Sequence, residues 1–127
     1  MFASFEKDYI MRIVREMVRM LLKLLFDIDT TRPMEDVIKE AEEQQTLERL
    51  LSMIDDGLIN EAENELYELI SDGDRIHLKT ALIFYYQLAG KDEEFLHSHG
   101  YTMEEVKEGV EDVVDRYGVS DIAMLAL

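Results

Sequence analysis

Histidine side chains are the first candidates for ligand or metal chemistry in this chain. His97 and His99 lie near the end of an expected helix 93–98, where they could converge with Asp92 or Glu93 on a zinc or nickel ion. A spacing of two residues, however, points side chains to different sides of a helix. We therefore expect an exposed pair of histidines, and we predict no metal site and no cofactor.

Other catalytic arrangements lack the residues that they need. No cysteine occurs among the 127 residues, which excludes disulfides, thiolate metal sites and a cysteine nucleophile, and fits a reducing cytoplasm. Glycine-rich phosphate loops and serine nucleophile elbows are also absent. His77 falls early in an expected helix, where a partly buried or capping role is the simplest interpretation. We therefore predict no catalytic residue and no enzyme.

Charge divides the chain into two unequal parts. The net charge is −16; residues 1–32 carry a net +1, whereas residues 33–127 carry −17. The larger part would repel nucleic acids and anionic lipids, so we expect no nucleic-acid partner and favour a basic or neutral protein partner. The simpler interpretation is that the acidic surface keeps the protein in solution.

The stretch 5–26 predicts an amphipathic helix with unusually wide apolar cover. Its charged residues keep three- and four-residue spacing along one stripe and interrupt any membrane-spanning run. Three explanations remain open: burial in the core, an interface with a second copy or a partner, or contact with a membrane surface. The charged residues are Arg12, Arg15, Glu16, Arg19 and Lys23.

Tyrosines supply the remaining candidates for an interaction surface, because they combine a large contact area with a polar tip. Tyr85 and Tyr86 are adjacent, so they point about 100° apart on a helix and cannot share one face of a pocket. The alternative is that the tyrosines belong to the core and only their hydroxyl groups reach the surface. The predicted surface comprises Tyr67, Tyr85, Tyr86, Arg12, Arg15 and Arg19.

Apolar spacing and capping residues predict the other helices. We expect helices at 34–56, 60–70, 75–89, 93–98 and 103–117, of which 75–89 is apolar nearly all round and belongs at the centre. Thr102 with Glu105 forms the clearest capping box, and Asn60 with Glu63 forms a weaker variant. Asp74 and Asp92 are expected N-caps, and Gly57 is expected to end a helix. The apolar tail 119–127 should dock on the body or on a second copy.

Two resemblances accompany this pattern. The stretch 46–90 is similar to a tetratricopeptide repeat in the spacing of Leu50, Gly57, Ala62, Leu66 and Leu69, with Ala81 and Tyr85 opening a second unit. It departs from that pattern because no Trp or Gly precedes these positions and Asp74 stands where Pro ends the repeat. DYIMRIVREMVRMLLKLLF, INEAENELYE, ALIFYYQLAG and YGVSD resemble a family of small bacterial helical proteins of unknown function, mostly from Firmicutes. This resemblance implies a cytoplasmic protein and supplies no catalytic residues.

The sequence thus predicts an all-α, compact helical domain of five to seven helices with a tetratricopeptide-like helical hairpin at its centre. Residues 1–127 form one domain, divided into 5–26, 34–90 and 91–127. The favoured function is a non-enzymatic protein–protein interaction or scaffold module, with a homodimer as one form of it. One alternative is a ligand-binding protein or enzyme with a pocket near Tyr85, Tyr86 and His77. The other is a peripheral membrane protein that binds through the basic residues of 5–26.

Overall fold

The computed structural model describes the backbone of residues 2–124 and the side chains of residues 9–124. Over these residues the chain is all-α, with eight helices and no strand, which confirms the predicted fold class. The count exceeds the expected five to seven because one predicted helix is divided and the tail adds a short one. The helices are α1 (Phe2–Phe26), α2 (Met34–Lys39), α3 (Gln44–Asp55), α4 (Ile59–Ile70), α5 (Arg75–Ala89), α6 (Glu93–Ser98), α7 (Met103–Arg116) and α8 (Ser120–Ala123).

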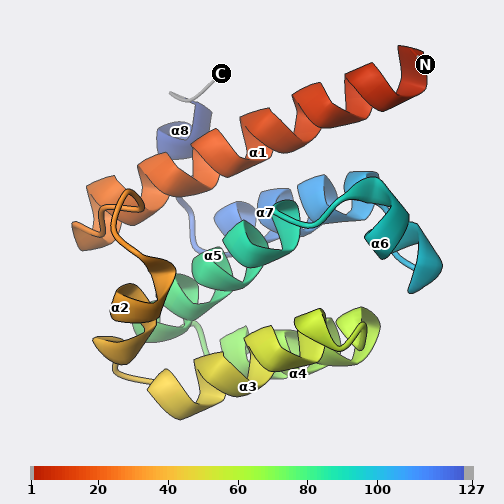
Figure 1. The fold of residues 1–127 in the computed structure, drawn as a ribbon. Helices are drawn as coiled ribbons and strands as arrows, with labels where there is room; N and C mark the ends of the chain where they lie inside the picture. Colours follow the sequence, from red (N-terminus) through yellow and green to blue (C-terminus); the bar gives the residue numbers. More distant parts are fainter. Residues whose placement is uncertain (1, 125–127) are drawn as a thin grey trace.

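Helix α5 occupies the centre, as its apolar composition predicts. Helices α1 and α7 pack on one part of its surface and α3 and α4 on another, while α8 lies against α1 and α7 (Figure 1). Nine of its fifteen residues are buried, among them Phe84 and Tyr85. A helix that is covered on several sides needs apolar residues in nearly every direction, which explains the weakly amphipathic pattern of 75–89.

The predicted single helix 34–56 is wrong, because the chain breaks between α2 and α3 at residues 40–43. Three glutamates at this break each reach a basic side chain elsewhere in the chain. Glu40 pairs with Arg32, Glu42 with Lys79, and Glu43 with His77. Helices in proteins are stabilised mostly by packing of an apolar face, which this segment lacks, and these tertiary contacts accompany the break.

The N-cap residues of three helices were predicted correctly, and that of a fourth helix was predicted wrongly. The side chains of Asp74, Asp92 and Thr102 accept hydrogen bonds from backbone N–H groups at the starts of α5, α6 and α7. Helix α4 instead begins at Ile59 without a side-chain cap, and Asn60 donates to the carbonyl of Gly100. Gly57 has a φ of 85°, which explains why glycine ends α3.

Glu63 has a tertiary role rather than the predicted capping role. Its Oε2 accepts hydrogen bonds from the hydroxyl groups of Tyr85, at 2.6 Å, and Tyr101, at 2.7 Å. Burial and the neighbouring carboxylate raise the pKa of both tyrosines well above the usual value, so both hydroxyls remain protonated donors. Gly109 leaves room for the Tyr85 ring, and this cluster therefore joins α4, α5 and α7.

Candidate functional site

Helix α1 is apolar over a wide arc that has a buried part and a more exposed part. The buried part packs against the body and consists of Met11, Val14, Met17, Val18, Leu21 and Leu22. The other, which we call the outer stripe, consists of Tyr9, Ile13, Met20 and Leu24. Spacings of four and seven residues place these four side chains on one side of the helix. Tyr9 is 56% exposed and Leu24 is 57% exposed, while Ile13 and Met20 are half-buried.

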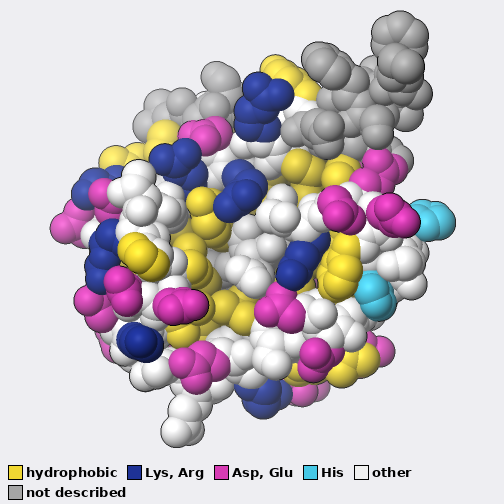
Figure 2. Space-filling view, in the orientation of Figure 1, with side chains coloured by type: hydrophobic (Ala, Val, Ile, Leu, Met, Phe, Trp, Pro, Cys, Tyr) yellow, Lys and Arg dark blue, Asp and Glu magenta, His cyan; other side chains and the backbone are white. Residues whose placement is uncertain are grey.

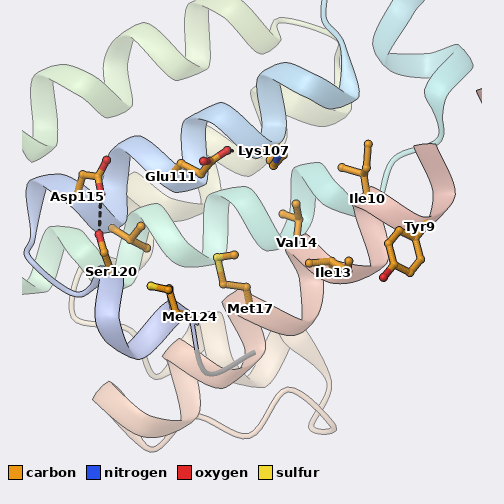
Figure 3. A pocket seen from close by; sticks show the side chains of 12 residues that line it. Tyr9, Ile10, Ile13, Val14, Met17, Lys107, Glu111, Asp115, Ser120 and Met124 are labelled. Carbon is orange, nitrogen blue, oxygen red and sulfur yellow. Dashed lines mark hydrogen bonds and ion pairs between the residues drawn. The ribbon is translucent and has the colours of Figure 1, made fainter. Parts of the chain in front are cut away.

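The N-terminal half of the outer stripe borders a groove between α1, α7 and α8 (Figure 3). The groove has a volume of about 500 Å³ and a mainly apolar floor. Met124, at the end of α8, is 65% exposed at its edge. The side chains that line it are Tyr9, Ile10, Ile13, Val14, Met17, Lys107, Glu111, Val114, Asp115, Ser120, Ala123 and Met124.

The exposed apolar side chains concentrate around this groove and the outer stripe. Four large hydrophobic residues are exposed among residues 9–124, namely Tyr9, Leu24, Leu58 and Met124. Three of them lie on the outer stripe or at the edge of the groove, and only Leu58 lies elsewhere. Single exposed apolar residues are ordinary, but a grouped set beside a groove is typical of a binding surface.

The α7 side of the groove is more acidic than basic. Lys107 lies 3.9 Å from Glu111, one turn along α7. The hydroxyl of Ser120, at the start of α8, donates to the Asp115 carboxylate at 2.6 Å. Two carboxylates and one ammonium group therefore border an apolar floor, which favours a partner that is apolar with a basic flank.

The arginines of the predicted surface lie on the flank of α1 opposite this groove. Arg15 stacks on Tyr86, with its guanidinium carbon 4.4 Å from the ring centre. Arg19 donates to Glu16 and to Thr30, both at 2.9 Å. Arg12 is exposed. Figure 2 shows several Lys and Arg side chains following α1 across the upper part of this face, whereas Asp and Glu are spread over the rest.

The tyrosines do not form the surface that the sequence predicts. Tyr85 is fully buried, so its inclusion in an interaction surface is wrong: the ring fills the space beside Gly109 and the hydroxyl bonds to Glu63. Tyr67 is half-buried, with the Arg116 guanidinium 4.9 Å from its ring centre. Tyr86 is half-buried beneath Arg15. Tyr85 and Tyr86 point in different directions, as expected, so Tyr85 lies in the core and Tyr86 lies near the surface.

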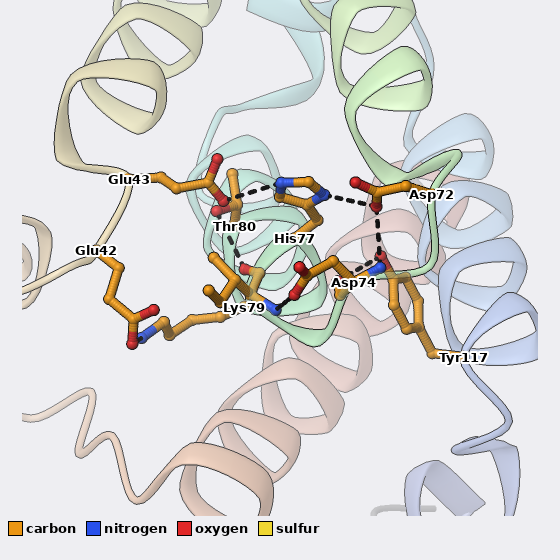
Figure 4. Close-up of polar contacts among 9 residues, drawn as sticks. Glu42, Glu43, Asp72, Asp74, His77, Lys79, Thr80 and Tyr117 are labelled. Carbon is orange, nitrogen blue, oxygen red and sulfur yellow. Dashed lines mark hydrogen bonds and ion pairs between the residues drawn. The ribbon is translucent and has the colours of Figure 1, made fainter.

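His77 joins the start of α3 to the turn before α5 (Figure 4). Its Nδ1 lies 2.9 Å from Asp72 Oδ1 and its Nε2 lies 3.3 Å from Glu43 Oε1. Carboxylates only accept, so only the doubly protonated ring can donate to both. Burial lowers the pKa of His77, but the Asp72 hydrogen bond and the charges of Glu43, Asp72 and Asp74 outweigh it, and the pKa is raised.

The remaining two histidines lie at the surface, at the end of α6. His97 and His99 are exposed, and His99 stacks on Phe95 with ring centres 4.5 Å apart. Glu94 and His97 have the Glu-x-x-His spacing of carboxylate-bridged iron proteins, a pattern that the sequence analysis overlooked. Among the residues that the structure describes, however, no group of three His, Cys, Asp or Glu side chains could hold a metal ion.

The fold is that of a compact all-α domain with a groove between α1, α7 and α8. Comparison with known proteins assigns the chain to a family. Residues 4–118 match a family of unknown function, DUF6483, and the chain belongs to this family. No curated protein and no solved structure matches the chain. No helix in the described part of the chain is long and apolar enough to cross a bilayer.

The outer stripe is the feature that sequence analysis missed. The apolar residues of 5–26 form one wide arc, as the sequence predicts, and the structure buries one part of it and leaves the outer stripe more exposed. The four-seven-four spacing shows that Tyr9, Ile13, Met20 and Leu24 share one side of the helix. Their exposure depends on where the other helices pack.

Proposed function

We propose that this protein is a non-enzymatic interaction module that docks an amphipathic helix with a basic flank along the outer stripe and the groove. The observation that carries this proposal is the position of three large exposed apolar side chains: Tyr9 and Met124 line the groove, and Leu24 continues the outer stripe along α1. Covering them would remove apolar surface from water, which favours association.

A helix suits this surface in length and in spacing. The outer stripe runs from Tyr9 to Leu24, which corresponds to roughly 22 Å of helix. Proteins that bind helices in grooves recognise apolar anchors about three, four and seven residues apart. A partner helix of four or five turns can therefore contact the stripe throughout its length.

Charge favours a basic partner over an acidic one. The whole chain carries −16, and Glu111 and Asp115 lie at the groove itself. A partner helix with Lys or Arg beside its apolar face gains from both the local and the long-range field, and the long-range field also speeds encounter.

The two alternative functions have less support. Tyr85 is buried and Tyr86 lies under Arg15, so these side chains offer no shared accessible pocket beside His77. Membrane binding would require an anionic surface to approach a strongly acidic body. The tetratricopeptide-like character of α3 and α4, the bacterial origin and the cytoplasmic location stay predictions from the sequence.

A synthetic helix tests this function without a known partner. The probe is a fluorescently labelled peptide with leucines at helical spacing and lysines on the opposite side, and its binding is followed by fluorescence anisotropy. A peptide of the same composition in scrambled order controls for charge alone. Ile13→Gln should weaken binding by roughly tenfold or more, because the site loses most of one apolar anchor.

Leu58→Gln is the matched control, because Leu58 is an exposed leucine away from the groove. It should bind the peptide as tightly as the unmodified protein does. Equal binding of the ordered and scrambled peptides, or an equal effect of both substitutions, would show attraction by charge alone and contradict the proposal.

A further inference from the structure

We infer that the docked helix is α1 of a second copy of this chain, running antiparallel to the first. This inference rests on the proposed docking function and names its partner. In this pair the basic flank of the second α1 lies away from Glu111 and Asp115, so apolar contact along the outer stripe, and not attraction by the groove carboxylates, holds the two copies together. The outer stripe reads the same in both directions, because Tyr9 and Ile13 are separated by four residues, and so are Met20 and Leu24. An antiparallel copy thus brings Tyr9 onto the partner's Leu24 and Ile13 onto the partner's Met20.

The two flanks of the outer stripe select the antiparallel direction. One flank is charged and carries Arg12, Glu16, Arg19 and Lys23; the other is apolar and leads into the groove through Ile10 and Met17. A two-fold axis across an antiparallel helix pair keeps like flanks together, whereas a parallel pair sets each charged flank against an apolar one. Only the antiparallel pair leaves the charges in water and covers both grooves.

The antiparallel arrangement gives the exposed Leu24 side chain a contact on the second copy. It is exposed on its own chain, where α1 approaches its C-terminal end. Antiparallel pairing places the partner's Leu24 beside Tyr9, which lines the groove. By symmetry the same contact forms twice, as an isologous interface requires.

Electrostatics also directs self-association to this helix. Two copies that each carry −16 repel one another over most of their surfaces. Residues 1–32 are the part with a net charge of +1, so the α1 faces are where two copies approach with least repulsion. Pairing also places Glu16 near the partner's Arg19. The exposed bond between Glu16 and Arg19 within one chain is weak enough to be exchanged.

The expected interface is small. Two helices of this length cover an area at the low end of stable interfaces, about 1,200 Å². We therefore expect a dimer that dissociates on dilution below micromolar concentration.

Disulfide trapping tests both the partner and its direction, and the absence of native cysteine makes it clean. Two variants of the full chain, Tyr9→Cys and Leu24→Cys, each replace an exposed residue and carry one thiol. They are mixed and equilibrated in a glutathione redox buffer, with a size tag on one of them. Antiparallel pairing predicts the mixed disulfide between the two variants and little of either same-variant disulfide. The same-variant positions would be about 15 residues, or roughly 22 Å, apart, whereas a disulfide needs Cα atoms within about 7 Å.

The other outcomes overturn the inference. Disulfides between two copies of the same variant, with none between the two different variants, would show a parallel pair. No disulfide at all, together with sedimentation of the unmodified chain as a monomer, would show that a second copy is not the partner. If the leucine–lysine peptide still docks through Ile13 in that case, the docking function stands and only the identity of the partner is wrong.

Discussion

Gly109→Ala should destabilise the fold, although alanine is normally the better helix residue. A Cβ at position 109 would lie 2.5 Å from Cε1 and the hydroxyl oxygen of Tyr85. The ring has little freedom to move, since it is fully buried, bonded to Glu63 at 2.6 Å and packed edge-on against Phe84. Position 109 therefore requires glycine, because the Tyr85 ring of α5 fills the space that a Cβ atom would need.

Two opposing free-energy contributions decide whether Gly109→Ala stabilises or destabilises the fold. Replacing glycine by alanine inside a helix gains about 1 kcal/mol. Overpacking a tight core costs about 1–3 kcal/mol, and displacing the Tyr85 hydroxyl from a carboxylate costs about 1.5–3 kcal/mol more. We expect a net loss of about 2 kcal/mol, which lowers Tm by roughly 6–10 °C in a domain of this size.

Urea unfolding followed by far-ultraviolet circular dichroism measures the effect. The same substitution should be made in a Tyr85→Leu background, where the shorter side chain leaves room for the new methyl group. There Gly109→Ala should cost little or should stabilise. A stabilised Gly109→Ala single variant, or an equal loss in both backgrounds, would refute the steric explanation.

Two further predictions concern single polar contacts between side chains. Tyr101→Phe should lower the free energy of unfolding, measured in urea, by about 1–2 kcal/mol, because Glu63 loses one of its two hydroxyl donors. Tyr117→Phe, which removes a longer hydrogen bond, is the control, and an equal or larger loss there would contradict this role of Tyr101. His77 has a raised pKa, so its contribution is full below its ordinary pKa of about 6.5 and is lost as pH rises through the folded-state pKa. The unmodified protein should therefore lose more stability than His77→Gln between about pH 6 and pH 9; parallel curves would contradict the ion pair.

Local signals carried the sequence prediction of the fold. Asp74, Asp92 and Thr102 cap helices because capping depends on residues within one turn. The central place of α5 also follows from its own composition. These features need no knowledge of distant residues.

The features that were missed depend on distant residues. Glu63 fits a capping pattern in the sequence, but its partners Tyr85 and Tyr101 are 22 and 38 residues away. The break at residues 40–43 follows from contacts of Glu43 with His77, and no local signal marks it. Such choices are made by tertiary packing and lie beyond periodicity and propensity.

The candidate site shows the same limit. The residue pattern of α1 predicts more apolar surface than one neighbouring helix can cover, and it leaves core, interface and membrane contact open. The structure divides that surface into a buried face and the outer stripe. The division depends on where α7 and α8 pack, which the spacing of α1 residues alone does not reveal.

Light scattering after size-exclusion chromatography tests the central claim most directly, comparing the unmodified chain with Leu24→Lys and Leu58→Lys. The single chain has a mass of 14.9 kDa. At concentrations well above micromolar, the unmodified chain and Leu58→Lys should show twice that mass, and Leu24→Lys should show the mass of one chain. A single-chain mass for all three proteins, or a dimer that survives Leu24→Lys, would contradict self-association through the outer stripe.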